Sequence, residues 1–294
     1  MTKELENHHI PYNYDVMFYK IFGDYNDLDL IKYLLENILD INIEKIEILN
    51  GKVLGDKIKT KKSFLDLLVR VNGKIIVNIE VNTDTSQIIK ERNISFLLKV
   101  AANDFKSGEK YRKFKKHIQY NFNVEDNTDY SIERYFFKEL NKDKILSKRL
   151  EIININLSYY SEKCYNEGIQ NLTEFEKLMG LLGAKDKEHE KIFANEKGML
   201  KKIMDKGEKF RNDSEIIDMY EHDLTLEEIH EYEIEEAVLE ATEKVTEEVT
   251  NKVTSSTIRS IATNMLNLNM NLEDISKATG LSIDELNELK KELD

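Results

Sequence analysis

Apolar residues recur every three to four positions in two stretches of the first half of the chain. Residues 14–40 contain two such sets, separated by a break at Gly23-Asp24, and residues 86–106 contain one more, followed by Gly108. Apolar residues at this spacing line one face of an amphipathic helix, and a glycine commonly follows the last helical residue. We therefore predict two helices in the first stretch and one in the second.

Other stretches have the composition and alternation of β-strands. Two of them are separated by Asn72-Gly73, which is a strong signal for a two-residue hairpin turn. The five strand-like stretches are residues 43–54, 63–71, 74–82, 117–124 and 150–157. Because strands and helices are mixed along this part of the chain, we expect an α/β fold with a mixed sheet flanked by helices, and neither a helix bundle nor a β-sandwich.

The remainder of the chain is polar and mostly helical in pattern. Residues 235–257 repeat valine and threonine every four positions, and this stripe predicts packing against a partner helix or a second copy of the chain; a marginal linker helix is the alternative. The short helices expected in residues 258–294 resemble half of a helix-turn-helix, but acidic residues outnumber basic ones there, which favours oligomerisation over DNA reading. The expected divisions are a core at 1–160, a helical extension at 161–234, a linker or coiled-coil segment at 235–257 and a helical motif at 258–294.

Charge is distributed unevenly along the chain. The net charge is −13, yet residues 1–123 carry 20 basic and 17 acidic side chains, whereas residues 212–294 carry 6 and 22. The acidity therefore lies in the C-terminal third, and the rest retains basic clusters such as residues 57–62, which include Lys61 and Lys62. Such clusters can hold phosphates by charge neutralisation, although a solvated face is the alternative.

The chain shows no signal for secretion or a membrane. It has one cysteine, Cys164, which cannot form an internal disulfide and which we interpret as structural. The first fifteen residues lack the apolar stretch of a signal peptide, and the longest apolar runs are too short to span a bilayer. We expect a cytoplasmic protein.

Two carboxylates lie inside otherwise apolar strand-like runs. Asp66 is found in FLDLLV and Glu80 in VNIEVN, on the two arms of the predicted hairpin. Burying a carboxylate is costly unless it is paired or binds a metal. A two-residue turn places Asp66 opposite Ile79, so the two acids reach one face only if a bulge or a longer loop shifts the register. Two acids that face solvent are the alternative.

Convergence of these acids would create a site for a hard divalent cation. Carboxylate oxygens suit Mg²⁺ or Mn²⁺, which can activate water and neutralise charge on a scissile phosphate. Asn82, two residues after Glu80, projects from the same side of its strand and could position the attacking water. A lysine at that position would also supply positive charge.

A series of short motifs occurs in the order found in a known nuclease family. They are Asp15-Val-Met-Phe-Tyr-Lys20-Ile-Phe-Gly23, Leu65-Asp66, Ile79-Glu80-Val81-Asn82, Arg92, Gly108-x-x-Tyr111, Ile118-Gln-Tyr-Asn-Phe122 and, more loosely, Ile275-x-x-Ala-Thr-Gly-Leu-Ser282. In this order they resemble the Rpn family of recombination-promoting nucleases and transposases, within the PD-(D/E)XK nuclease superfamily. Tyr19 stands where that family has lysine, and Lys20 follows one position later.

The resemblance implies a restriction-endonuclease-like core, a divalent metal and cleavage of DNA. Asp66 and Glu80 would be metal ligands, and Asp15 would be an accessory acid or a structural hydrogen-bond partner. Lys20 would contact phosphate or simply be exposed. Arg92 would hold a carboxylate or a phosphate, or form a surface ion pair.

Asn82 departs from the family pattern, which has glutamine in many relatives and lysine in the wider superfamily. Asparagine can orient water but supplies no positive charge, so it puts catalysis in question more than fold. Three hypotheses follow: an active DNA endonuclease, an impaired homologue that binds DNA or regulates a partner, and an interaction protein whose acidic helical tail drives homo-oligomerisation. The third is compatible with either of the others.

Overall fold

The computed structural model describes residues 9–49, 67–83, 85–105, 108, 110–124, 130–142 and 144–293. The chain forms two compact units, Met1–Tyr220 and Glu221–Asp294. The strands are β1 (Ile46–Ile48), β2 (Leu67–Val71), β3 (Ile75–Asn82), β4 (Lys116–Asn123), β5 (Ile132–Lys138) and β6 (Ile145–Asn156). The helices are α1 (Asp15–Phe22), α2 (Leu28–Leu39), α3 (Gln87–Asp104), the 3-10 helix η2 (Tyr111–Lys113), α4 (Leu157–Glu167), α5 (Glu174–Leu182), α6 (Lys187–Lys191), α7 (Gly198–Arg211), α8 (Ser214–Asn267), α9 (Leu272–Thr279) and α10 (Ile283–Leu293).

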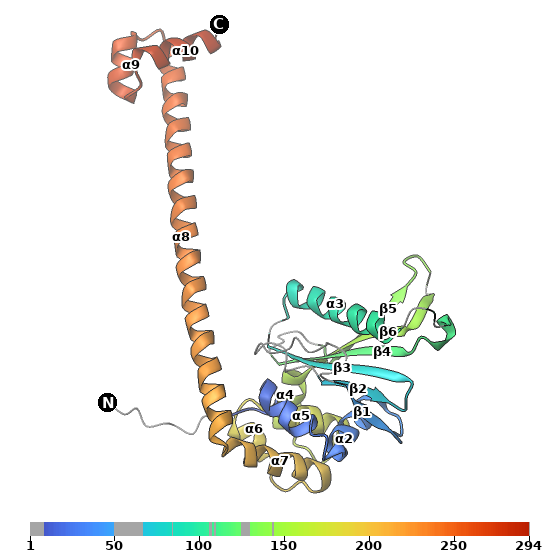
Figure 1. The fold of residues 1–294 in the computed structure, drawn as a ribbon. Coiled ribbons are helices and arrows are strands. Elements are labelled where there is room, and N and C mark those ends of the chain that lie inside the picture. Colours follow the sequence, from blue (N-terminus) through green and yellow to red (C-terminus); the bar gives the residue numbers. More distant parts are fainter. Residues whose placement is uncertain are drawn as a thin grey trace, which may run out of the picture. The chain divides into compact units, whose positions relative to one another are not determined.

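The six strands form one mixed sheet in the order β1-β2-β3-β4-β6-β5 (Figure 1). Strands β3, β4 and β6 are parallel neighbours, whereas β1 and β2 at one edge and β5 at the other pair antiparallel. A parallel pair needs a crossover connection, and α3 provides it between β3 and β4. The predicted α/β fold with a mixed sheet is therefore confirmed.

The turn between β2 and β3 is longer than predicted. Val71 pairs with Ile75 rather than with Lys74, so three residues form the turn, and the expected two-residue register is wrong. Asn72 and Gly73 both have positive φ, and the Asn72 side-chain oxygen accepts hydrogen bonds from the backbone amides of residues 44 and 45. These additional bonds to the segment before β1 favour the longer turn. The register then runs to Leu67 opposite Ile79.

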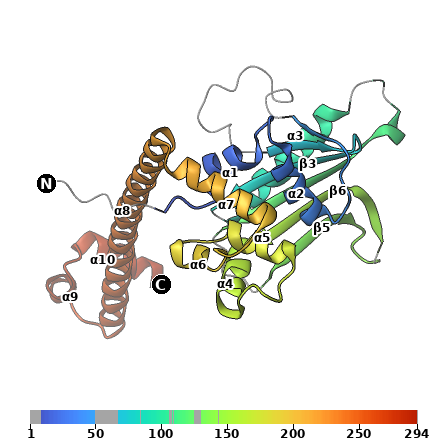
Figure 2. The ribbon, with the colours of Figure 1, turned by 90° about the horizontal axis from the view of Figure 1, so that it is seen from below.

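One face of the sheet carries the main hydrophobic core. Its inward residues from β3 and β4 include Val77, Ile79 and Phe122, which belong to the same buried cluster as Phe18 of α1 and Leu34 of α2. Seen from below, α1, α2, α5 and α7 lie over this face (Figure 2). Each of these helices contributes an apolar face to the cluster, which explains for α1 and α2 why their helical periodicity was readable from the sequence.

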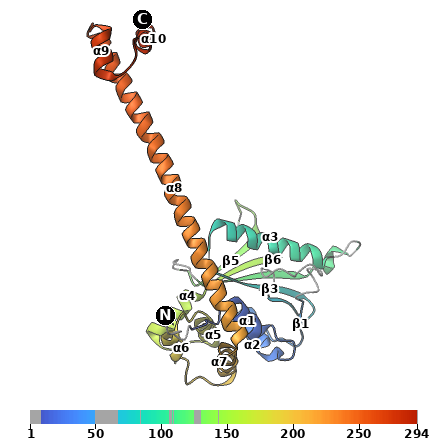
Figure 3. The ribbon, with the colours of Figure 1, turned by 60° about the vertical axis from the view of Figure 1, so that its left-hand side comes forward.

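The other face of the sheet is covered by α3 (Figure 3). A small apolar cluster lies beneath this helix, formed by Leu49, Leu68, Ile76 and Val100. Further buried positions on this face are polar, and Asn78, Glu80 and Asn82 of β3 are the first of them. The two faces of the sheet therefore differ in chemistry while both are covered by helices.

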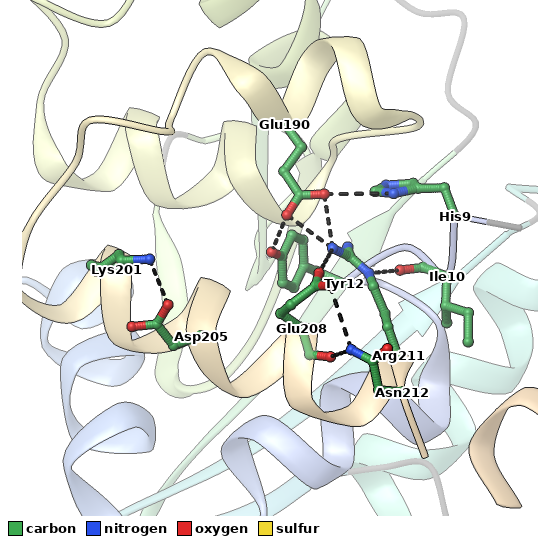
Figure 4. A network of polar contacts seen from close by, with 9 residues as sticks. All are labelled: His9, Ile10, Tyr12, Glu190, Lys201, Asp205, Glu208, Arg211 and Asn212. Atoms are coloured by element: carbon green, nitrogen blue, oxygen red, sulfur yellow. Dashed lines mark hydrogen bonds and ion pairs between the residues drawn. The ribbon is translucent and has the colours of Figure 1, made fainter. Parts of the chain in front are cut away.

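Polar contacts fasten the N-terminal segment to α6 and α7 (Figure 4). The Arg211 guanidinium lies 2.9 Å from both oxygens of Glu190, donates from Nε to the carbonyl of Ile10, and stacks 4.6 Å above the ring of Tyr12. The Tyr12 hydroxyl donates to Glu190, and His9 lies 3.5 Å from the same carboxylate. A carboxylate shared by several partners in this way fixes the N-terminal chain before α1.

The second unit is a long helix with a small helical cluster at its end. Helix α8 runs without interruption across the expected divisions between residues 234 and 235 and between residues 257 and 258. Ala262 near its end packs with Ile275 of α9 and with Leu286 and Leu289 of α10. A capping box begins α10, because Ser282 and Glu285 exchange hydrogen bonds between side chains and backbone amides.

Two strands depart from prediction in the region that follows β4. Strand β5 was not predicted, because most of its residues are exposed on both faces and show no alternation. Strand β6 begins at Ile145, five residues before the predicted start, since its first half pairs with β5 rather than with the core. At the other edge, β1 covers three residues of the predicted 43–54.

Candidate active site

Glu80 is a buried carboxylate near the carboxyl end of β3. Its side chain is 7% exposed, and it projects from the face that α3 covers. Arg92, one turn into α3, places Nη2 2.7 Å from Glu80 Oε1 and also donates to Asn82 Oδ1 at 3.0 Å. The guanidinium therefore offsets the cost of burying the carboxylate and bridges two residues that share one side of the strand. Of the roles predicted for Arg92, the structure shows it holding a carboxylate.

A row of amides continues from Glu80 across the neighbouring strands. Gln119 on β4 donates from Nε2 to Glu80 Oε2 at 3.3 Å and to Asn121 Oδ1 at 3.0 Å. Asn121 in turn donates to Asn154 of β6 at 2.8 Å. On β3, Asn78 donates to the Gln119 side-chain oxygen at 3.0 Å. Each of these amides is less than a tenth exposed, so Glu80 belongs to a buried hydrogen-bonded network.

A second row of hydrogen-bonded side chains runs parallel to the first. On each strand it lies two residues nearer the carboxyl end. Asn82 donates to Asn123 Oδ1 at 3.2 Å, and Asn123 donates to the Tyr130 hydroxyl at 2.8 Å. Asn156 donates to the Tyr130 carbonyl at 3.2 Å, and its oxygen caps α4 by accepting from the Tyr159 amide. Both rows lie near the carboxyl ends of β3, β4 and β6, the end at which α/β sheets commonly bind ligands.

The amide network was not predicted, although the sequence contained its signal. Polar residues occupy every second position of β4, from His117 through Gln119 and Asn121 to Asn123, and Asn154 and Asn156 continue this pattern on β6. Such alternation normally predicts a solvent-facing side. Here the polar side is buried, so the alternation marked an internal polar layer.

The two predicted residues on α1 lie on a helix that packs against the opposite face of the sheet. Asp15 is its first residue and is partly buried, and Lys20 is exposed near its end. The buried side of this helix contributes Met17 and Phe18 to the main core, whereas Glu80 faces α3. The structure therefore does not place Asp15 and Lys20 on the face of the sheet from which Glu80 projects.

The remaining predicted site residues, Asp66, Lys61 and Lys62, lie outside the described residues. Among the residues that are described, no group of three or more histidine, cysteine, aspartate or glutamate side chains is placed to hold a metal ion. The described part of the site thus supplies one carboxylate, Glu80. The amide oxygen of Asn82 lies nearby as a second oxygen that could coordinate a metal ion.

Two other polar positions of this part of the molecule have a structural explanation. Burial lowers the pKa of His117, which lies against α3 with Nε2 3.4 Å from Asp104. Burial also raises the pKa of the Cys164 thiol to about 12, which keeps it a neutral packing residue between α4 and α5. None of the described helices is both long enough and apolar enough to cross a membrane.

The fold and the site together define a class of protein. A mixed six-stranded sheet with helices on both faces, and an acid near the carboxyl end of an inner strand, is a restriction-endonuclease-like α/β arrangement. The family model of the PD-(D/E)XK nuclease family transposases matches residues 12–237, so the chain belongs to this family. Membership indicates a nuclease linked to mobile elements. Comparison with curated proteins and with solved structures gave no match.

Proposed function

We propose that the protein is a metal-dependent endonuclease that hydrolyses phosphodiester bonds of DNA, in a role linked to mobile elements or recombination. The observation that carries this proposal is the buried Glu80 carboxylate, held by Arg92 beside Asn82. A carboxylate, a guanidinium and an amide at one strand end are the groups needed to hold a cation, contact a phosphate and orient water. We also propose a cytoplasmic location, as expected from the sequence.

The donor chemistry fits Mg²⁺ or Mn²⁺, because both ions prefer oxygen ligands. Glu80 would be one ligand and Asp66 the other. The pairing of Leu67 with Ile79 supports this choice, since Asp66 and Glu80 are the next residues in the sequence beyond that pair. The ion, when bound, would activate water and offset charge on the phosphate.

Arg92 supplies the positive charge that Asn82 lacks. Its side chain is 44% exposed, so the guanidinium can reach a phosphate at the mouth of the site while it remains near Asn82. Arg92 also pairs with a Glu80 oxygen that a cation would use. We therefore propose that Arg92 releases part of this contact when the ion binds and then turns toward the phosphate. Asn82 would orient the attacking water, and Asp15, on the helix that packs against the opposite face, would keep only the structural one of the two roles predicted for it.

The decisive experiment measures nicking of supercoiled DNA by the full chain with Mg²⁺, with Mn²⁺ and with EDTA. We expect cleavage only with a divalent ion, and its loss in Asp66→Asn and in Glu80→Gln. Glu151→Gln is a matched control, because Glu151 is another buried carboxylate of the same sheet, paired with Lys116 at 2.6 Å, away from Glu80. Cleavage that persists in both Asp66→Asn and Glu80→Gln would refute the proposal.

The second candidate is an impaired homologue that binds DNA without cutting it, and Asn82 is the observation that favours it. In that case the wild-type chain would be inert with both ions and would still bind DNA. We propose Lys61 and Lys62, together with Arg92, as contacts for the DNA backbone under either function, whereas Lys20 lies exposed on α1, which packs against the opposite face of the sheet, and is proposed as a solvated residue. Substituting Lys61 and Lys62 by alanine should weaken binding in a salt-dependent manner without regard to sequence.

We also propose that α8 joins two copies of the chain. Val245, Val249 and Val253 each remain more than half exposed on this helix, and α8 is too long to bury such a stripe within its own unit. Replacing Val245 and Val249 by glutamine in the full chain should lower the sedimentation coefficient if they form a helix–helix contact. An unchanged oligomeric state would reject this role and leave α8 as a linker.

A further inference from the structure

The hairpin of β5 and the first half of β6 is basic and carries exposed aromatic rings. Residues 132–149, which we call the basic arm, contain six lysine or arginine residues and three acidic ones in a chain whose net charge is −13. Tyr135 and Phe137 are each 49% exposed, and Leu146 is 81% exposed. Large apolar side chains left in water among positive charges are typical of a surface that binds a partner.

The basic arm is connected to Glu80 by an unbroken series of hydrogen bonds. The row from Glu80 through Gln119, Asn121 and Asn154 continues when Asn154 donates to Glu133 Oε2 at 3.4 Å. The Tyr135 hydroxyl donates to the same Glu133 oxygen at 2.6 Å. Tyr135 is thus the outermost group of the network that begins at the candidate active site.

The aromatic rings face the same side of the sheet as Glu80. Glu133 pairs with Asn154 and Tyr135 with Ile152, so both project from the face that carries the amides. Phe137, two residues further along β5, follows the same alternation, because the extra residues of the register shift lie on β6. Three strand spacings separate β3 from β5, which is about 14 Å, the span of a few nucleotides.

We propose that the basic arm binds a single-stranded segment of the DNA whose scissile phosphate lies at Glu80, with bases stacked on Tyr135 and Phe137. The inference rests on the proposed function for the nature of the substrate. Exposed aromatic rings stack on bases only when those bases are unstacked from a duplex, whereas exposed lysines of the arm such as Lys142 and Lys144 neutralise the phosphates. The arm therefore selects single-stranded or frayed DNA over an intact duplex.

Charge argues against a second copy of the chain as the occupant. Strand β5 is an edge strand, and its outer side could pair with another strand. A symmetric pair of arms would bring the same lysines and arginines against themselves, and like charges repel in such a contact. A polyanion satisfies the same side chains without this repulsion.

The test is fluorescence anisotropy of labelled oligothymidylate, about 20 nucleotides long, with the full chain in EDTA. EDTA prevents metal-dependent cleavage, so the measurement is independent of whether the proposed nuclease activity exists. We expect the double variant Tyr135→Ala/Phe137→Ala to bind at least about ten-fold more weakly, because removal of each stacked base costs roughly 5- to 150-fold in affinity. Binding of the oligothymidylate–oligoadenylate duplex should change less than about two-fold.

Three controls decide the meaning of that result. Tyr135→Phe keeps the ring and removes the hydrogen bond to Glu133, so it should bind like wild type. Tyr232→Ala removes an exposed ring, 73% accessible, from the acidic helix α8 and should also have no effect. Replacing Lys142 and Lys144 by alanine should flatten the salt dependence by about 0.7 in the log–log slope for each phosphate that is no longer neutralised.

Several outcomes would overturn the proposal. One is wild-type affinity for oligothymidylate in the double variant. Another is an equal loss for single strand and duplex, which would show that the arm reads the backbone alone. A third is a change of sedimentation coefficient in the double variant, which would identify the arm as a contact between copies of the chain. Nicking of DNA by the same preparations, assayed with Mn²⁺, reports separately on the proposed function.

Discussion

The two faces of the sheet are equally buried and chemically opposite. On β4, Tyr120 and Phe122 lie in the main core, while Gln119 and Asn121 project to the other side and are also at most 3% exposed. Apolar side chains gain free energy on burial, whereas amides lose their hydration and recover it only through hydrogen bonds. Burying the amide face therefore stabilises the fold less than burying an apolar face of the same size would. The amides lie around Glu80, and Gln119 holds that carboxylate by hydrogen bonding.

The largest effect on stability should come from the apolar face. Phe122→Ala removes a fully buried ring that packs edge-to-face against Phe18 at 5.9 Å. We expect a loss of about 3 kcal/mol in the free energy of unfolding, measured by urea denaturation, because a cavity remains in a tightly packed cluster. DNA cleavage per folded molecule should stay within about two-fold of wild type. A selective loss of cleavage without destabilisation would contradict this division between the faces.

A smaller effect is expected when the amide face is interrupted. Gln119→Leu preserves the size of the side chain but removes its bonds to Glu80, Asn121 and Asn78. We expect a loss of about 2 kcal/mol in the free energy of unfolding, since buried polar partners are left without their hydrogen bonds. Calorimetric titration with Mn²⁺ should also show weaker binding, because Glu80 is deprived of a group that orients it. Gln119→Glu is unsuitable as a control, since it would place a second acid beside Glu80. Val77→Ala on the apolar face is the appropriate one.

Arg92→Gln should separate stability from metal binding. Removing the guanidinium leaves Glu80 without this cation, and we expect a loss of only about 1 kcal/mol because the Arg92 side chain is 44% exposed. Mn²⁺ should bind a few-fold more tightly, since nothing competes for Glu80 Oε1, yet cleavage should fall at least about ten-fold. Arg92→Lys, which keeps the charge, should recover part of the cleavage. Parallel losses of metal affinity and cleavage would show that Arg92 serves only to maintain the structure.

The smallest effect is a dependence of stability on pH. Burial lowers the pKa of His117 below its usual value of about 6.5, although nearby Asp104 acts in the opposite direction. Below pH 6.5 the unfolded chain therefore protonates His117 more readily than the folded chain does. This contribution to stability is present above pH 6.5 and is lost as pH falls through the lowered pKa. Urea midpoints at pH 7.5 and pH 5 should differ more for wild type than for His117→Gln. The pKa of His9 is also lowered by burial, but His9 is present in both proteins and cancels in the difference.

Local patterns were sufficient for several parts of the protein. The helical spacing in residues 14–40 and 86–106 predicted α1, α2 and α3. Glu80 could be selected because a carboxylate within an apolar strand is unusual whatever its partners are. These features depend on residues a few positions apart, and side chains so close in sequence constrain one another in any fold.

Tertiary structure decided the partners of Glu80 and the surface beyond them. The longer turn at Asn72 depends on bonds to residues 44 and 45, and Gln119 lies 39 residues from Glu80 in the sequence. Strand β5 exists because it pairs with β6, and its own residues show no alternation that would predict it. Which side of an alternating strand is buried depends on which layer covers it, and this can be known only once α3 has packed over β4 and β6. The sequence by itself thus determined α1, α2, α3, most of the inner strands and the candidate acid, while packing between distant segments decided the environment of that acid.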